Sequence, residues 1–179
     1  VLILTQALID ELTAGGQVQP GSAKPLGVVR TGVAVKSGEP QPKVDTAKSL
    51  KAALLAAQGI YFPDPFKATA GIHFMNVLNK LGIAEQVAGA LRPFPNGATA
   101  MKEMAAATGP GLIGCTQVTE ILYTPGVQLV SVLPKEFELA TVYTAAMAAN
   151  ADQPQAARMM IDLLTAPAAA ELRRAGGFE

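Results

Sequence analysis

The stretch from Phe62 to Ile72 reads Phe-Pro-Asp-Pro-Phe-Lys-Ala-Thr-Ala-Gly-Ile, and it decides the fold class. Residues 60–62 just before the first proline are β-branched or aromatic, which favours a short strand. The Asp64-Pro pair is typical of a loop, and a helix is predicted over 70–81. Strand, loop and helix in this order form the repeating unit of an α/β protein.

The same alternation extends outward in both directions along the chain. Helix starts are marked by residues that cap N-termini: Thr5, Asp45 or Thr46, Asn96, and Asp152 with Pro154. We therefore predict a mostly parallel sheet covered by helices. The other strands are expected at 1–4, 26–36, 91–94, 112–115, 127–133 and 140–149.

The first strand, 1–4, is entirely apolar, and the chain begins without Met. Four consecutive apolar residues are typical of a strand buried on both faces. Such a strand needs neighbours on both sides, and no residue precedes it here. We therefore expect a further segment upstream of Val1.

Composition excludes several classes of function. The 179 residues are 50% apolar and 16% charged, with 14 basic and 14 acidic side chains and no basic cluster. Nucleic acids and anionic membranes are bound by clustered Lys and Arg, so neither partner is expected. The apolar runs are too short for a membrane-spanning helix. The single cysteine, Cys115, excludes an intrachain disulfide and an all-cysteine metal site.

Small residues at the start of the 70–81 helix favour binding of an anion. Thr69, Ala70 and Gly71 leave backbone N–H groups uncovered, and the helix dipole favours negative charge at this end. The hydroxyl of Thr69 is a further donor. The simpler interpretation is an ordinary helix start, because turns of this kind are common in α/β proteins.

The strand at 112–115 ends in polar residues, Thr116 and Gln117. Ligands of open α/β sheets bind beyond the carboxyl ends of strands, so both residues are candidates for the wall of a ligand site. A plain strand end explains the pattern equally simply.

Other chemistry-bearing residues lack partners in the sequence. His73 is the only histidine and is expected to pack rather than bind metal. We expect no catalytic residues, because no paired-carboxylate, phosphate-loop or dinucleotide motif occurs. Met101 and Met104, and the Met159-Met160 pair, are interpreted as core residues.

The order of these features resembles the molybdate-binding periplasmic proteins of ABC importers, within the type II solute-binding fold. The landmarks are residues 1–5, 64–72, 112–120 and 125–127, then Leu133-Pro134 followed by Tyr143, and finally 176–178. The resemblance implies a two-lobed α/β protein whose first lobe is incomplete. Lobe I would contain 1–33 plus 141–179, and lobe II 34–140.

The resemblance also implies a ligand shell and partners. The backbone N–H groups of Ala70 and Thr116 and the hydroxyl of Tyr143 would bind a tetrahedral oxyanion, with Thr69 and Gly71 beside them. The hydroxyl of Thr116 would be an added donor. Relatives carry an upstream segment with a signal peptide and two serine-bearing loops. We thus expect a periplasmic or extracellular monomer that delivers its ligand to a membrane permease, with no catalysis, cofactor or metal.

Two rival interpretations remain open. The chain would be a stable protein-interaction module if the loop Ser22-Ala23-Lys24-Pro25 engaged a protease, since Lys before Pro resists tryptic cleavage. It would be a small hydrolase if Cys115 acted as a nucleophile with His73 as its base. The sequence offers no motif or third, orienting group for that pair.

Overall fold

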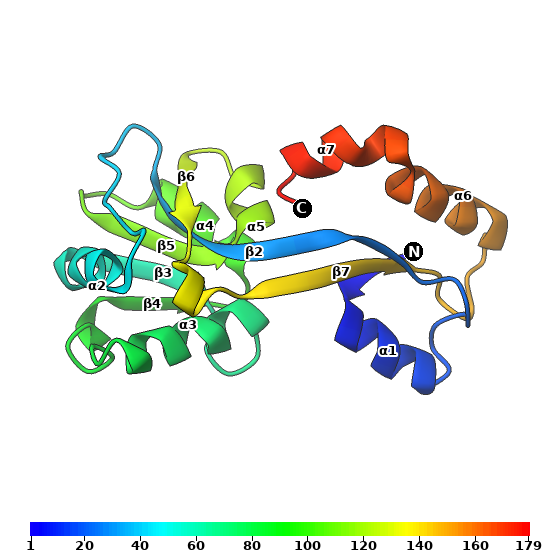
Figure 1. The fold of residues 1–179 in the computed structure, drawn as a ribbon, viewed down its shortest axis with the longest axis horizontal. Coiled ribbons are helices and arrows are strands. Elements are labelled where there is room, and N and C mark those ends of the chain that lie inside the picture. The colour runs from blue at the N-terminus through cyan, green and yellow to red at the C-terminus, as the bar shows by residue number, and fades with distance from the viewer. The chain divides into compact units, whose positions relative to one another are not determined.

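The computed structural model describes residues 1–179 as two units (Figure 1). Unit 1 contains 1–29 and 140–179, and unit 2 contains 30–139. The chain passes from unit 1 to unit 2 within strand β2 (Lys24–Lys36). It returns just before strand β7 (Ala140–Ala146). Each unit has its own core and is described separately.

Unit 2 is built on a mixed sheet. Strand β3 (Gly59–Pro63) pairs in parallel with β4 (Leu91–Phe94) and β5 (Leu112–Gln117). Strand β2 is antiparallel to both β5 and β6 (Val127–Val132). The predicted mostly parallel sheet is therefore wrong outside β4–β3–β5, because β2 runs opposite to β5.

Helices cover both faces of this sheet. On one face, α2 (Ala47–Ala56) and α3 (Thr69–Lys80) pack over the largest core cluster. On the other, α4 (Gly97–Ala106) and α5 (Val118–Tyr123) pack over a smaller one. Single 3₁₀ turns lie at Ala88–Ala90 and Lys135–Phe137. Helix α5 was not predicted, since its six residues offer only one buried pair, Val118 and Ile121.

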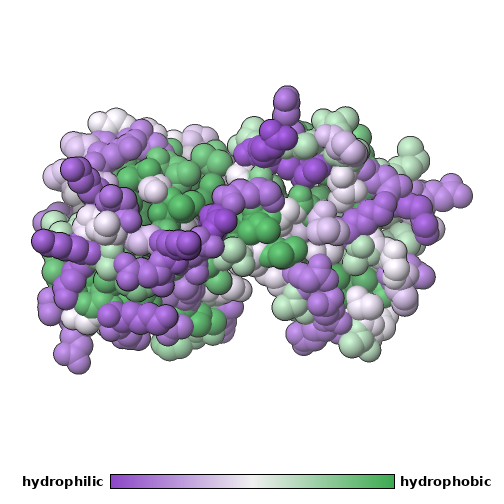
Figure 2. All heavy atoms as spheres, viewed as in Figure 1, coloured by the Kyte–Doolittle hydropathy of each residue, from purple (hydrophilic) through white to green (hydrophobic).

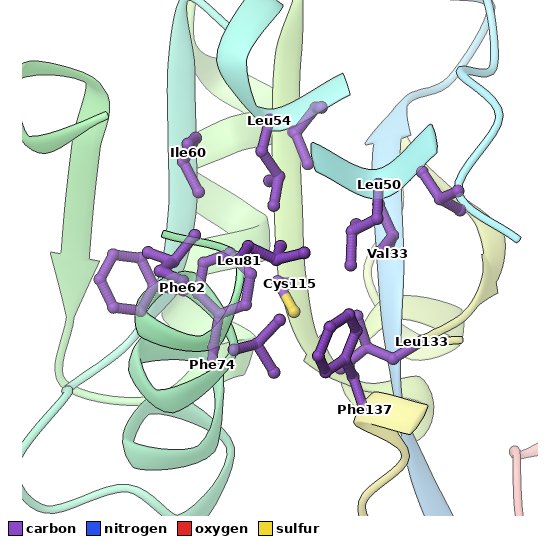
Figure 3. Packing of buried hydrophobic residues seen from close by; sticks show 14 of the residues in the cluster. Val33, Leu50, Leu54, Ile60, Phe62, Phe74, Leu81, Cys115, Leu133 and Phe137 are labelled. Atoms are coloured by element: carbon purple, nitrogen blue, oxygen red, sulfur yellow. The ribbon is translucent and has the colours of Figure 1, made fainter. Parts of the chain in front are cut away.

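The main core lies between α2, α3 and the sheet (Figure 3). Phe74 of α3 is fully buried, and its ring centroid lies 5.4 Å from that of Phe62 on β3. Leu50 and Leu54 of α2 reach the same cluster, as does Cys115 of β5. Tilted aromatic pairs add to the free energy of burying their area. This packing fixes α3 against β3 and β5, and so fixes where α3 begins.

Unit 1 is organised around β7. Strand β1 (Leu2–Thr5) pairs antiparallel with β7, with Leu2 opposite Ala146 and Thr5 opposite Tyr143. Neighbouring residues of β7 join different clusters. Ala146 packs with Ile9 of α1 (Gln6–Ala14), while Ala145 packs with Ile161 of α6 (Pro154–Thr165). A 3₁₀ turn (Pro167–Ala169) and α7 (Ala170–Ala175) complete the unit.

Within this chain, residues 1–4 are covered on one face. Leu2 and Leu4 pack against the α1 cluster, whereas Ile3 is 46% exposed. Strand β1 lies at the end of its sheet with β7 as its neighbour. An apolar run therefore does not by itself distinguish a one-sided from a two-sided strand.

Three predicted helix caps are confirmed. Thr5 accepts a hydrogen bond from the Leu8 N–H, and Asn96 accepts one from the Thr99 N–H. Thr46 forms a reciprocal capping box with Ser49, which settles the choice between Asp45 and Thr46. Each side chain satisfies a backbone donor that the helix leaves unpaired.

The four methionines singled out from the sequence divide into two pairs. Met101 and Met104 are fully buried, as predicted, but Met159 is 72% exposed and Met160 48% exposed. The buried side of α6 follows Ala157 and Ile161, four residues apart, and the Met pair falls outside it. Figure 2 shows a largely hydrophilic face on which apolar side chains gather in patches.

Candidate functional site

The candidate site lies at the carboxyl edge of the parallel strands β4, β3 and β5. These strands end at Phe94, Pro63 and Gln117, and α4, α3 and α5 begin a few residues later. Parallel pairing brings the three strand ends to one edge of the unit 2 sheet. This is the edge at which open α/β sheets bind ligands.

Helix α3 begins at this edge without a capping side chain. The carboxylate of Asp64 is engaged elsewhere, because it accepts hydrogen bonds from the N–H groups of Phe66 (2.7 Å) and Lys67 (3.0 Å). The first helical hydrogen bond runs from the Ile72 N–H to the Ala68 carbonyl (2.9 Å). The N–H groups of residues 69–71 precede that bond, so they point out of the positive end of the helix dipole.

Gly71 brings the start of α3 against the loop that follows β3. A Cβ at this position would lie 2.3 Å from the carbonyl oxygens of both Pro63 and Asp64. Only glycine allows this approach. Gly71 and Ala70 are buried, whereas Thr69 is exposed. The two loop carbonyls thus hold the first turn of α3 in place.

Helix α4 begins differently, because its donors are used within the chain. Asn96 caps it, and a carboxylate oxygen of Glu120 accepts from the Ala98 N–H (3.1 Å). The other oxygen of Glu120 accepts from the hydroxyl of Thr116. A carboxylate of the protein therefore occupies this positive helix end.

The expectation that the hydroxyl of Thr116 is an added ligand donor is corrected by this contact. Thr116 is fully buried and its hydroxyl donates to Glu120. Glu120 was not predicted as a site residue, because Thr116 lies on β5 and Glu120 on α5, and no single periodic pattern contains both. Thr116 lies opposite Gly32 of β2, and the backbone groups of Thr31 pair on the other side of β2, so the Thr116 N–H faces Gly32 within the sheet. Its role as a ligand donor stays a prediction.

The residues of the rival hydrolase are not arranged for nucleophilic chemistry. Cys115 is fully buried in the core, and burial raises the pKa of its thiol far above the ordinary value. The Nε2 atom of His73 lies 2.7 Å from the carbonyl oxygen of Phe137, so the histidine joins α3 to the 3₁₀ turn 135–137. His73 is packed, as predicted.

We expect Cys115 to resist alkylation while the protein is folded. Its thiol is inaccessible and is not ionised at neutral or mildly alkaline pH, whereas only the thiolate reacts. Intact mass after incubation with iodoacetamide at pH 8 checks this. Native protein should stay unmodified, and protein in guanidinium chloride should gain one adduct. Rapid labelling of the native protein would contradict the buried position.

Tyr143, the third predicted ligand group, belongs to unit 1. It lies on β7 opposite Thr5, and its ring meets that of Phe178 edge to face, with 6.4 Å between centroids. Ala70 and Thr116 belong to unit 2. The convergence of these three residues on one ligand stays a prediction.

The structure shows neither a cluster of metal-ligating side chains nor a helix that could span a membrane. No group of three or more His, Cys, Asp or Glu side chains is arranged to hold a metal ion. No helix combines the length and the apolar character needed to cross a bilayer.

Comparison with known proteins decides the family. The model of the bacterial extracellular solute-binding proteins matches residues 1–179. The chain belongs to this family. A solute-binding protein of this fold is also found among solved structures. The Azotobacter vinelandii periplasmic molybdate-binding protein superposes with a TM-score of 0.75 at 16% identity, covering 98% of this chain and 75% of the other.

Two more proteins that resemble this solute-binding protein carry names of different kinds. The sulfate-binding protein of Mycobacterium tuberculosis superposes with a TM-score of 0.67 at 16% identity, over 98% of this chain and 67% of that one. An aconitate isomerase from Pseudomonas sp. is 25% identical over all of this chain, which spans 66% of the isomerase. The structural likenesses show the fold, an α/β solute-binding fold, as predicted.

Proposed function

We propose that this solute-binding protein captures a tetrahedral oxyanion of the molybdate or tungstate kind, outside the cytoplasm, for an ABC importer. The observation that carries the proposal is the uncapped start of α3 at the carboxyl edge of β3. A helix end with free N–H groups binds anions through both hydrogen bonds and the dipole. Units 1 and 2 would correspond to lobes I and II of the solute-binding fold.

The contrast between α3 and α4 supports this choice of helix. Both begin at the same edge of the sheet, yet the Glu120 carboxylate takes the Ala98 N–H of α4. A second negative charge at α4 would be repelled by Glu120. At α3 no carboxylate accepts from the first N–H groups of the helix, because Asp64 accepts from Phe66 and Lys67 instead.

The name of the Pseudomonas relative supports a second candidate ligand, an organic carboxylate such as aconitate. A carboxylate is also an anion, so the start of α3 suits it equally. Isomerisation by proton transfer would need a base within reach of the ligand. At this edge of unit 2, Asp64 and Glu120 both accept backbone N–H groups, and His73 is bonded to Phe137. These engagements favour binding without catalysis.

We expect molybdate and tungstate to bind with one-to-one stoichiometry, and sulfate and phosphate to bind more weakly. Isothermal titration with these four anions and with aconitate tests the proposal. If aconitate binds most tightly, the ligand of this site is an organic carboxylate and not a tetrahedral oxyanion. Failure to bind any of the five would remove the anion site and leave only the family's general solute binding.

Two substitutions of Thr69 test whether the anion binds at the start of α3. Thr69→Pro removes one N–H at the first helical position, where proline is well tolerated, and Ala68 before it has the extended backbone (φ −92°, ψ 130°) that proline requires. The loss of one hydrogen bond to a charged ligand should weaken binding by about ten- to hundredfold. Thr69→Val removes only the hydroxyl and serves as the matched control. Unchanged affinity in Thr69→Pro would show that the Thr69 N–H is not a ligand donor.

A further inference from the structure

The hydroxyl of Thr31, on β2, has no hydrogen-bond partner although the residue is 1% exposed. Both backbone groups of Thr31 are paired. Its N–H donates to the Leu139 carbonyl (3.1 Å), and its carbonyl accepts from the Leu133 N–H (3.0 Å). A buried hydroxyl without a partner is costly and rare, so its presence needs a reason.

The sequence of β2 makes this hydroxyl more unusual. The buried residues two apart along the strand are Val29, Thr31, Val33 and Val35. Residues two apart in a strand share a face. Valine has nearly the shape of threonine and no polar group, so the chain carries a hydroxyl where its own pattern would place a methyl group.

The register of the sheet places Thr31 on the face that α3 covers. Thr31 lies directly opposite Gln117, the last residue of β5. Two residues further along the same face, Val33 lies opposite Cys115, and both join the core cluster that contains Phe74 of α3. Thr31 therefore lies at the carboxyl end of β5, on the side of the sheet where α3 begins.

A second set of contacts leads to the same place. The segment 133–139 accepts the Thr31 N–H at Leu139, and two residues earlier the Phe137 carbonyl is bonded to His73. His73 lies one turn after Thr69, at the start of α3. One short segment thus links the backbone of Thr31 to the first turns of α3, independently of the pairing between β2 and β5.

We propose that the Thr31 hydroxyl is a ligand contact, which donates a hydrogen bond to an anion held at the start of α3. This inference rests on the proposed anion site. It adds to that site a hydrogen-bond donor from strand β2 of the unit 2 sheet. A hydroxyl suits the role because it adds no charge, and its hydrogen rotates toward the acceptor. Selectivity among anions then depends on whether an oxygen reaches β2 while the others meet the N–H groups of residues 69–71.

The test uses Thr31→Val, which removes the hydroxyl and keeps the shape, and Thr31→Ser, which keeps the hydroxyl. Molybdate and aconitate are titrated into each variant by calorimetry, and thermal unfolding is followed without anion. We expect Thr31→Val to bind the preferred anion about ten- to hundredfold more weakly. Thr31→Ser should bind within a few-fold of the original chain. Without anion, Thr31→Val should unfold at the same or a higher temperature, because it removes an unpaired polar group.

Thr124→Val is the matched control. The Thr124 hydroxyl is also buried in unit 2, but it donates to the Glu120 carbonyl (2.7 Å). Its removal should lower the unfolding temperature and leave anion affinity unchanged. If Thr31→Val behaves in this way, the Thr31 hydroxyl has a partner within the protein and the inference is wrong. It is also wrong if Thr31→Val binds as tightly as the original chain, although the proposed function would then stand. If the original chain binds none of the five anions named under the proposed function, both the proposed function and this inference are wrong.

Discussion

Replacing Gly71 by alanine should weaken anion binding at least about tenfold and destabilise unit 2. The new Cβ would lie 2.3 Å from two backbone carbonyl oxygens, those of Pro63 and Asp64. Neither oxygen can move away by a side-chain rotation, so the first turn of α3 must shift. Overpacking of this kind costs about 1–3 kcal/mol. A displaced helix start would no longer present its N–H groups together, so we expect affinity to fall at least about tenfold.

The control for this variant is Gly89→Ala. A Cβ at Gly89 meets nothing within 4 Å, so the substitution should be neutral or slightly stabilising. Calorimetric titration with molybdate and urea unfolding of both variants provide the two measurements. Full anion affinity in a folded Gly71→Ala protein would show that the start of α3 is not the anion site. If Gly71→Ala is as stable as the original chain, the loop after β3 moves to make room for the new Cβ at little cost in free energy.

Replacing Phe74 by alanine should strongly destabilise unit 2. Phe74 is fully buried between α3 and the sheet, with the Phe62 ring 5.4 Å away. Truncation of a buried phenylalanine costs about 3–5 kcal/mol, because contacts are lost and a cavity remains. For a protein of this size, that corresponds to a fall of roughly 6–20 °C in Tm.

Phe66→Ala is the matched control for Phe74→Ala. Phe66 precedes the same helix but is 85% exposed, so its removal should change stability by less than about 0.5 kcal/mol. Urea unfolding or differential scanning calorimetry compares the two variants. A loss below about 1 kcal/mol for Phe74→Ala would mean that α3 is not held by the core described here. The position of the anion site would then lose its main support.

Phe74 and Gly71 hold the start of α3 in two different ways. Phe74 fixes α3 against the sheet from within the core, whereas Gly71 fixes its first turn against the loop after β3. Both positions lie within six residues of Thr69. Binding lost with little loss of stability is therefore expected only for variants such as Thr69→Pro, which remove a donor and leave both anchors.

Several features of the protein follow from local sequence. Thr5, Thr46 and Asn96 cap helices where their residue types predict, because a cap depends only on a side chain and the next three residues. The strand, loop and helix around residues 60–81 are likewise local, and their repetition along the chain indicates an α/β fold. The uncapped start of α3 was visible in the small residues Thr69, Ala70 and Gly71.

Other features depend on partners distant in sequence. The position of β1 at the end of its sheet follows from its pairing with β7, more than 130 residues away. The exposure of Met159 and Met160 follows from which side of α6 meets β7. The short helix α5 carries too few residues for a periodic pattern. Propensity and periodicity describe a segment alone, and none of these outcomes is a property of a segment alone.

The candidate site also depends partly on local sequence and partly on tertiary contacts. Sequence by itself determined the α/β class, the helix starts and the anion-favouring turn at residues 69–71, because backbone N–H groups at a helix start require only local geometry. Only the tertiary structure decided which groups are available to a ligand. In the folded protein the Thr116 hydroxyl donates to Glu120, and the same carboxylate accepts from the Ala98 N–H at the start of α4. The Thr31 hydroxyl has no partner. Hydrogen bonding is settled by which atoms meet across the sheet, and that register arises only when the strands pair.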